Sequence, residues 1–312
     1  MKIYEYKVGC KLPLRDCALA IGLFDGFHIA HRALIKKTAE AAKEKGLSAG
    51  IFTFVSNESI KNGAKKIYST EEKLMIAKSL GVDFAVVASF SDISHLTAEE
   101  FVKDTLTCDL SVKIALAGFN FKFGKGALGD AKMLTSLMKA SGGEAIIFNE
   151  YTYGGITVSS TLIREHLIEG RMAEAAALLG EPYFLTGVVS HGDGRGRALG
   201  LPTVNTDIQD EKLIPKIGVY RSAVLLSGRL FSAVTNVGTC PTFGERKPHA
   251  ETFILDFDGE LYGESIRVYL LEYLREEKSF KDENELVLQI KLDINYTIKK
   301  NGELKWQELG LK

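Results

Sequence analysis

The sequence predicts an α/β domain with a doubly wound parallel sheet, followed by an antiparallel β domain that ends in a helix. Between residues 19 and 150, short runs rich in Val, Ile and Phe alternate with segments of helical periodicity. This alternation is typical of a parallel sheet covered on both faces. After about residue 180 the strand-like runs follow each other without helices between them, which indicates an antiparallel barrel or sandwich.

Five apolar runs are the expected strands of the parallel sheet. They are LAIGLF, AGIFTFV, DFAVVASF, KIALAGF and EAIIFNE, starting at residues 19, 49, 83, 113 and 144. Capping signals mark the helices between them, because Ser69 with Glu72, and Thr97 with Glu100, have the spacing of a capping box. Ligands of such sheets bind at the carboxyl ends of the strands, so we expect a site in the loops that follow these runs.

The antiparallel part has its own set of five runs. They are YFLTGVVS, GVYRSAVLL, RLFSAVTNVG, AETFILDF and ESIRVYLLEYL, starting at residues 183, 218, 229, 250 and 264. Residues 160–180 read as one linking helix, and a terminal helix carries an apolar stripe of Leu286, Ile290, Ile294 and Ile298. We therefore expect one domain over residues 1–181 and a second over residues 182–312.

Composition restricts the classes of function. The 312 residues carry a net charge of -1, with 46% hydrophobic and 25% charged residues, which is typical of a globular protein and gives no sign of nucleic-acid binding. The four cysteines form no CxxC pair, and no run of about 18 apolar residues occurs. We expect a cytoplasmic protein with small-molecule partners and no membrane contact; the sequence does not indicate its oligomeric state.

A histidine pair follows the first predicted strand. AIGLFDGFHIAHRALI, from residue 20, reads as a strand, a tight turn at Asp25 and Gly26, and a helix. His28 and His31 then lie at the helix start, beside the amide N–H groups that favour anions. Two imidazole donors there suit the charge that develops when a nucleophile attacks the α-phosphate of a nucleotide. Alone, the pair also fits two surface histidines, and two ligands are too few for zinc.

A second group of donors opens the linking helix. VSSTLIREHL, from residue 158, places Ser159, Ser160 and Thr161 at a helix start with Arg164 one turn later. These groups could hold terminal phosphates. Taken alone, the same residues also fit an ordinary N-cap followed by a solvated arginine.

Together the two stretches resemble the HxGH and SSTxxR signatures of the nucleotidyltransferase superfamily, in particular the FAD synthetase module of prokaryotic bifunctional riboflavin kinase/FAD synthetases. The resemblance implies a Rossmann-like domain that adenylylates FMN to FAD and releases pyrophosphate, with His28 and His31 at the α-phosphate. The segment AGFNFKFGKGALGD, residues 117–130, is similar to a flavin-facing segment of that family. The residues so implied for nucleotide and phosphate are Gly22, Phe24, Asp25, Gly26, Ser159, Ser160, Thr161 and Arg164, and those for flavin are Asn120 and Phe123.

The N-terminal motifs also depart from the family pattern. Leu23 and Ala30 replace the residues usual in GNFDG and HxGH, and the Pro-His-Pro common after the second strand is absent. An alternative interpretation is therefore a riboflavin kinase with a degenerate adenylyltransferase domain.

A glycine-rich loop precedes a short extended segment in HGDGRGRALGLPTVN, residues 191–205. Successive glycines let backbone N–H groups turn toward phosphate oxygens, so the loop is a candidate phosphate cradle, although a simple surface turn also fits. It matches neither a Walker A loop nor a dinucleotide fingerprint. The residues of this candidate cradle are Gly192, Gly194, Arg195, Gly196, Arg197 and Gly200.

The residues after the loop predict a metal site and a base. In a strand, Thr203 and Asn205 project to the same face and present two hard oxygens, which Mg²⁺ bound to a nucleotide could use. Glu251 shares its strand face with the apolar Phe253 and Leu255, where a carboxylate is costly unless it is paired or functional. Burial would raise its pKa and make it a base near neutral pH, whereas a salt bridge or an edge position are the alternatives.

The second half of the chain resembles riboflavin kinase. GDGRGRALGLPTVN, GVYRSAV, TNVGTCPTFG, AETFILDFDGELYGE and LREEKSFKDENELVLQIKLD match that family's motifs in order. The resemblance implies a six-stranded barrel in which Thr203 and Asn205 bind ATP-magnesium, Glu251 deprotonates the ribityl 5'-hydroxyl of riboflavin, and Arg275 contacts the flavin. The expected ligands are ATP with Mg²⁺, riboflavin, FMN and FAD. A non-catalytic flavin sensor remains the alternative from another class.

Overall fold

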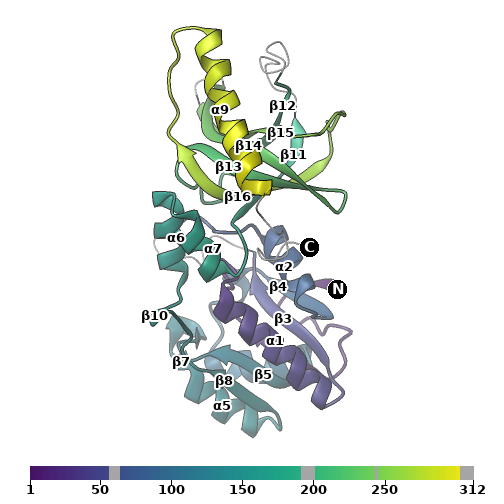
Figure 1. Ribbon diagram of the computed structural model, residues 1–312. Helices are drawn as coiled ribbons and strands as arrows, with labels where there is room; N and C mark the ends of the chain where they lie inside the picture. Colours follow the sequence, from purple (N-terminus) through teal and green to yellow (C-terminus); the bar gives the residue numbers. More distant parts are fainter. Residues whose placement is uncertain (56–63, 191–200, 243–244, 303–312) are drawn as a thin grey trace. The chain divides into compact units, whose positions relative to one another are not determined.

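The computed structural model describes residues 1–55, 64–190, 201–242 and 245–302 (Figure 1). The chain divides into two compact units, Met1–Ser160 and Thr161–Lys312. The expected boundary between residues 181 and 182 lies inside the second unit, because the two helices that follow Ser159 group with the C-terminal strands. In the described part of the chain, no helix is long and apolar enough to cross a membrane.

The first unit contains a six-stranded parallel sheet, which confirms the predicted doubly wound class. Its strand order is β1-β4-β3-β2-β5-β8, and every pairing is parallel. The order reverses at β2, which lies between β3 and β5, so the carboxyl ends of β2 and β5 flank the point where ligands of such sheets bind. The strands are β1 (Lys2–Tyr6), β2 (Cys17–Ile21), β3 (Ser48–Phe54), β4 (Phe84–Ala88), β5 (Val112–Gly118) and β8 (Glu144–Phe148).

The helices of the first unit connect these strands, and both predicted capping boxes form. Ser69 and Glu72 exchange hydrogen bonds at the start of α2, and Thr97 and Glu100 do so at the start of α4. The helices are α1 (Ile29–Glu44), α2 (Thr70–Ser79), α3 (Phe90–Ile93), α4 (Ala98–Glu100), the π-helix η3 (Phe101–Asp109), the 3-10 turn η4 (Lys125–Ala127) and α5 (Ala131–Ala140). Short pairs complete the unit: β6 (Lys122–Phe123) with β7 (Gly129–Asp130), and β9 (Thr152–Tyr153) with β10 (Ile156–Thr157).

Strand β1 was not among the five predicted strands. Its sequence KIYEY is largely exposed and lies at the edge of the sheet, so it lacks the two-sided apolar run by which the other strands were recognised. Tyr6 fixes its end, because the phenol donates to Asp109 at the end of η3 (2.6 Å). Burial and the Asp109 carboxylate both raise the pKa of Tyr6, which keeps this donor protonated.

The second unit contains a closed antiparallel barrel. Of the two architectures predicted for this part of the chain, a barrel or a sandwich, the barrel is confirmed. The strand order around it is β11-β12-β15-β14-β13-β16. Its elements are β11 (Phe184–Ser190), β12 (Thr203–Asp207), β13 (Gly218–Leu226), β14 (Arg229–Thr242), β15 (Glu245–Ile254), β16 (Ser265–Arg275) and the terminal helix α9 (Glu283–Gly302). The single linking helix was wrong: α6 (Ser160–Glu169) and α7 (Met172–Leu179) are separated at Gly170, which has φ +77°.

The two faces of the barrel wall have different environments. On the inner face, Thr235 shares hydrogen bonds with Ser222 (2.7 Å) and Thr252 (3.0 Å), and all three are fully buried. On the outer face, Val219, Val234 and Leu255 form an apolar cluster, and Ile294 of α9 packs against it. Helix α9 therefore covers the outside of β13 and β14 (Figure 1).

The apolar stripe predicted for α9 is partly wrong. Ile298 is 53% exposed, whereas the polar residues Asp293, Thr297 and Asn301 are buried. The reason is that arginines on the barrel need partners: Arg221 donates to Asn301 at 2.7 Å, and Arg275 pairs with Asp293. Polar pairing thus determines which face of the helix is covered.

Candidate active sites

The turn after β2 has a strained backbone that only a few residues tolerate. Phe24 and Phe27 have φ of 50° and 43°, and Gly26 has φ of 80°. A Cβ atom on Gly26 would lie 2.9 Å from Cδ1 of Ile67, so any other residue would be strained by the positive φ and would have to displace the end of the Ile67 side chain. Strain of this kind persists only where surrounding contacts hold it, and it is common at functional sites.

Hydrogen bonds from three directions hold the turn. The Leu23 carbonyl accepts from Thr53 Oγ1 and from Lys73 Nζ, both at 3.1 Å. Asp25 accepts the Ile67 backbone N–H on its carboxylate (3.2 Å), and its carbonyl accepts from Ser160 Oγ (2.8 Å). The two predicted motifs therefore meet, and Ser160 contacts the turn itself. At the end of β2, the Gly22 N–H donates to the Phe52 carbonyl (3.1 Å).

The two histidines stack at the start of α1. His28 is the N-cap of this helix, and its Nδ1 accepts from the His31 backbone N–H at 3.4 Å. Because that Nδ1 acts as an acceptor, the ring proton of neutral His28 is on Nε2. The ring centroids are 3.6 Å apart, and Phe24 packs edge-on against His31. The helix N-terminus therefore places an imidazole N–H donor beside the backbone N–H groups of the first turn of α1.

Burial keeps both imidazoles neutral. It lowers the pKa of His28 to about 4, and it lowers the pKa of His31 well below the usual value, with His28 and Lys73 adding to the effect. His31 Nδ1 is buried without a hydrogen-bond partner among the described residues. At neutral pH the pair can thus donate hydrogen bonds to a phosphate without already carrying charge.

Lys73 is a member of this site that the sequence analysis missed. Its side chain is buried, and Nζ donates to the Leu23 carbonyl and to the Phe54 carbonyl (3.4 Å), which joins the ends of β2 and β3. The available signal was a lysine on the same face of α2 as the buried Ile76 and Ala77. A lysine on the apolar face of a helix requires specific partners.

The remaining predicted residues of this half lie in different environments. Asn120 is exposed just beyond β5, at the switch point of the sheet. Phe123 is buried in the core between the rings of Phe101 and Phe121. Ser159 precedes α6, and Thr161 and Arg164 lie on α6 in the second unit. Flavin and pyrophosphate contacts by these residues stay predictions.

In the barrel, the predicted metal ligands and base lie together. Asn205 of β12 is directly opposite Glu251 of β15, and Thr203 is opposite Phe253. Thr203 Oγ1 donates to Glu251 Oε1 at 2.6 Å. All three project from the outer face of the wall, because the neighbouring Ala250 and Thr252 are fully buried on the other face. Glu251 is half-buried there, beside the apolar cluster under α9.

Two family models match the chain and together cover most of it. The FAD synthetase model matches residues 11–162, and the riboflavin kinase model matches residues 179–300. A bifunctional riboflavin kinase/FMN adenylyltransferase of Bacillus subtilis is 32% identical over 296 residues, which cover 92% of this chain and 93% of the Bacillus protein. The chain belongs to the bifunctional riboflavin kinase/FMN adenylyltransferase family. It carries both enzyme domains of that family.

Other relatives agree over nearly the whole length. Proteins with the same description from Listeria monocytogenes and Escherichia coli K12 are 36% and 33% identical, covering 88% and 90% of this chain and 89% and 91% of their own. A solved structure from Streptococcus pneumoniae, described as a macrolide-efflux protein, is 30% identical with a TM-score of 0.83 and covers 95% of this chain and 99% of that one. The whole two-unit chain thus has a known fold.

The oxygen atoms beside Glu251 fit a magnesium ion, which this family's use of ATP implies. The Thr203 hydroxyl donates its hydrogen bond to Glu251, so the lone pairs of the hydroxyl oxygen remain available to a cation. The Asn205 amide oxygen is a second neutral, hard donor on the same face. Mg²⁺ takes few protein ligands when nucleotide phosphates complete its shell, so this pair suffices chemically.

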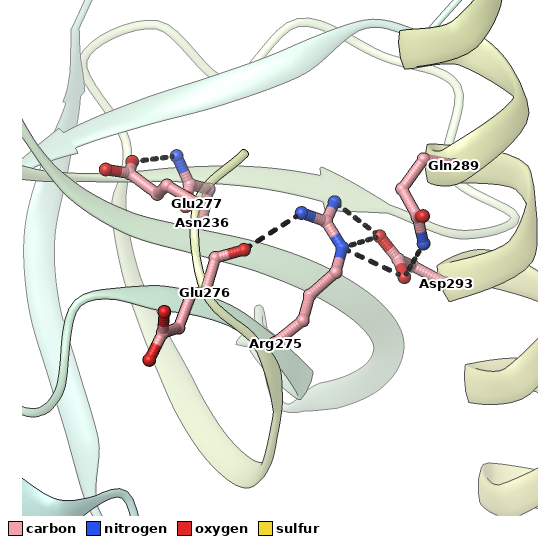
Figure 2. Close-up of polar contacts among 6 residues, drawn as sticks. All are labelled: Asn236, Arg275, Glu276, Glu277, Gln289 and Asp293. Carbon is pink, nitrogen blue, oxygen red and sulfur yellow. Dashed lines mark hydrogen bonds and ion pairs between the residues drawn. The ribbon is translucent and has the colours of Figure 1, made fainter. Parts of the chain in front are cut away.

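The other predicted kinase residues divide into two groups. The candidate phosphate cradle of Gly192, Gly194, Arg195, Gly196, Arg197 and Gly200 lies outside the described residues and stays a prediction. Arg275, predicted to contact flavin, binds the Asp293 carboxylate with Nη2 at 2.7 Å and Nε at 3.0 Å, as Figure 2 shows. Its Nη1 donates to the Glu276 carbonyl (3.2 Å), so the guanidinium joins β16 to α9.

Proposed function

We propose that the chain phosphorylates riboflavin to FMN with ATP in its barrel and adenylylates FMN to FAD in its parallel-sheet domain. The observation that carries the first activity is the Thr203–Glu251 hydrogen bond with Asn205 directly opposite, within the part that matches riboflavin kinase. We assign the adenylyltransferase to residues 1–181 and the kinase to residues 182–312. The use of ATP fits a cytoplasmic location.

In the kinase reaction, Glu251 accepts the proton of the ribityl 5'-hydroxyl while that oxygen bonds to the γ-phosphorus and the bond to ADP breaks. We place the transferred proton on Oε2 of Glu251, because Thr203 already donates a hydrogen bond to Oε1. Thr203 and Asn205 would hold Mg²⁺ through their side-chain oxygens, and the ion would supply positive charge to the phosphates. Arg275 sets the position of the segment after β16, where we place the flavin.

In the adenylyl transfer, a phosphate oxygen of FMN attacks the α-phosphorus of ATP and pyrophosphate leaves. His28, through Nε2–H, and His31 donate with the N-terminus of α1 to the α-phosphate oxygens as their charge grows. Ser160, Thr161 and Arg164 hold the pyrophosphate, and Asn120 faces the flavin. The transfer is direct and needs no covalent enzyme intermediate.

Leu23, in place of the asparagine usual in the family, was one reason to consider a degenerate adenylyltransferase. The structure uses this residue through its backbone carbonyl, which accepts from Thr53 and Lys73 whatever the side chain is. The replacement of the family's usual asparagine therefore leaves the supports of the turn in place. This supports an active first domain.

One assay separates the interpretations. The pure chain is incubated with riboflavin, ATP and Mg²⁺, and the flavins are resolved by chromatography. We expect FMN to appear first and FAD to accumulate from it. FMN alone would favour a chain with a degenerate adenylyltransferase, and unchanged riboflavin would favour a flavin sensor.

A further inference from the structure

Asn236 is a polar residue at a strand position where the neighbouring residues favour an apolar one. It lies within β14, directly opposite Glu251 of β15 and Val219 of β13. Asn205 is opposite Glu251 on the other side, so the carboxylate has an amide on each neighbouring strand. Val219 belongs to the apolar cluster under α9. Asparagine is disfavoured within strands, and an apolar residue would suit this place better.

The Asn236 amide has a fixed orientation and an unused acceptor. Its Nδ2 donates to Glu277 Oε1 at 2.9 Å, a contact drawn in Figure 2. That bond determines which end of the amide is the oxygen. Oδ1 is buried, and no donor among the described residues reaches it. A buried acceptor left without a hydrogen bond is unfavourable.

Gly238 and helix α9 both help to position Glu277 for its contact with Asn236. A Cβ atom on Gly238 would lie 2.5 Å from Glu277 Oε1, so a side chain there would displace the carboxylate. The preceding residue, Glu276, is held through its carbonyl by Arg275, which α9 holds through Asp293 (Figure 2). The glycine and the helix therefore both contribute to the orientation of the amide.

We infer that Asn236 Oδ1 binds a hydroxyl of the polyol chain of the phosphate acceptor, next to the terminal hydroxyl that Glu251 deprotonates. A polyol presents hydroxyl donors on adjacent carbons, and Glu251 and Asn236 offer acceptors from adjacent strands. Glu277 is the positioning residue that keeps the oxygen of the amide toward the substrate. The inference rests on the proposed riboflavin kinase activity.

The test compares Asn236→Ala with the unchanged full-length chain, using riboflavin and its 2'-, 3'- and 4'-deoxyribityl analogues. A neutral hydrogen bond contributes about 0.5–1.5 kcal/mol, so kcat/KM for riboflavin should fall about 2- to 12-fold. For one analogue, which lacks the hydroxyl bound by Asn236, the variant and the unchanged chain should have equal kcat/KM. Conversion of supplied FMN to FAD is measured on the same preparations as a control for the amount of intact chain, and a urea unfolding curve of each variant checks that its barrel is folded.

Two further variants make the test specific. Ser232→Ala alters β14 four residues away and should leave the kinase constants within about twofold. Glu277→Ala removes an exposed side chain that the fold does not need and releases the amide, so it should reproduce the Asn236→Ala pattern more weakly. It also serves if Asn236→Ala fails to fold.

The outcomes separate this inference from the proposed function. If the unchanged chain forms no FMN, the kinase function fails and the inference fails with it. If it forms FMN but the variants lose the same factor with riboflavin and with every analogue, the kinase stands and the contact between Asn236 and the polyol is overturned.

Discussion

Replacing Thr203 with valine tests whether the hydrogen bond between the Thr203 hydroxyl and Glu251 contributes to catalysis. The substitution removes the hydroxyl that donates to Glu251 Oε1 at 2.6 Å and keeps the β-branched shape that suits a strand. A hydrogen bond to a charged group contributes about 1.5–3 kcal/mol. Since about 1.36 kcal/mol corresponds to a factor of ten in rate, kcat for FMN formation should fall about 10- to 150-fold.

The assay is steady-state formation of FMN at several magnesium concentrations. Thr203→Val also removes one proposed oxygen ligand, so the half-saturating magnesium concentration should rise, and Thr203→Ser should restore both quantities. Thr206→Val is the matched control, because Thr206 is on the same strand but faces the barrel interior, where its hydroxyl contacts the Ala250 carbonyl. If Thr203→Val kept more than half of the normal kcat with unchanged magnesium dependence, the reasoning would be refuted.

Three further predictions concern the pH response, the strained turn and the pairing of α9. Because the pKa of His28 is about 4 in the folded chain and about 6.5 when unfolded, the unfolded state binds more protons as the pH falls below about 7. His28 alone should therefore contribute a loss of about 2 kcal/mol in the free energy of unfolding between pH 7 and 5, measured as the difference between the unchanged chain and His28→Gln in urea unfolding. Gly26→Ala forces a side chain against Ile67 at positive φ, so FAD formation from FMN should fall at least about tenfold in the flavin assay while FMN formation continues. Arg275→Met leaves the buried Asp293 carboxylate unpaired and should lower the free energy of unfolding of the barrel by about 3–5 kcal/mol, and a loss below about 1 kcal/mol would contradict the pairing.

Local patterns were enough to predict the parts of the structure that depend on near neighbours. The capping box of Ser69 and Glu72 follows from a spacing of three residues, and both of its hydrogen bonds form. The placement of Thr203 and Asn205 on one face follows from the alternation of a strand. Such features need no knowledge of what packs against them.

The parts that were missed depend on residues far apart in the chain. Lys73 acts through a carbonyl 50 positions away, and Asn236 through a carboxylate 41 positions away. The buried face of α9 follows from Arg275 of the barrel, which pairs with Asp293. The pattern of residues within one helix or strand does not show which distant residues will contact it. From the sequence alone, Lys73 and Asn236 therefore could not be distinguished from surface residues.

The most direct measurement of the central claim is the pair of activities of Glu251→Gln in the full-length chain. The amide keeps the size of the side chain but cannot accept the substrate proton, and loss of a general base lowers a rate about 100- to 10,000-fold. We predict that FMN formation from riboflavin falls by that factor while FAD formation from supplied FMN stays within about twofold. Retention of FMN formation by this variant would contradict the account.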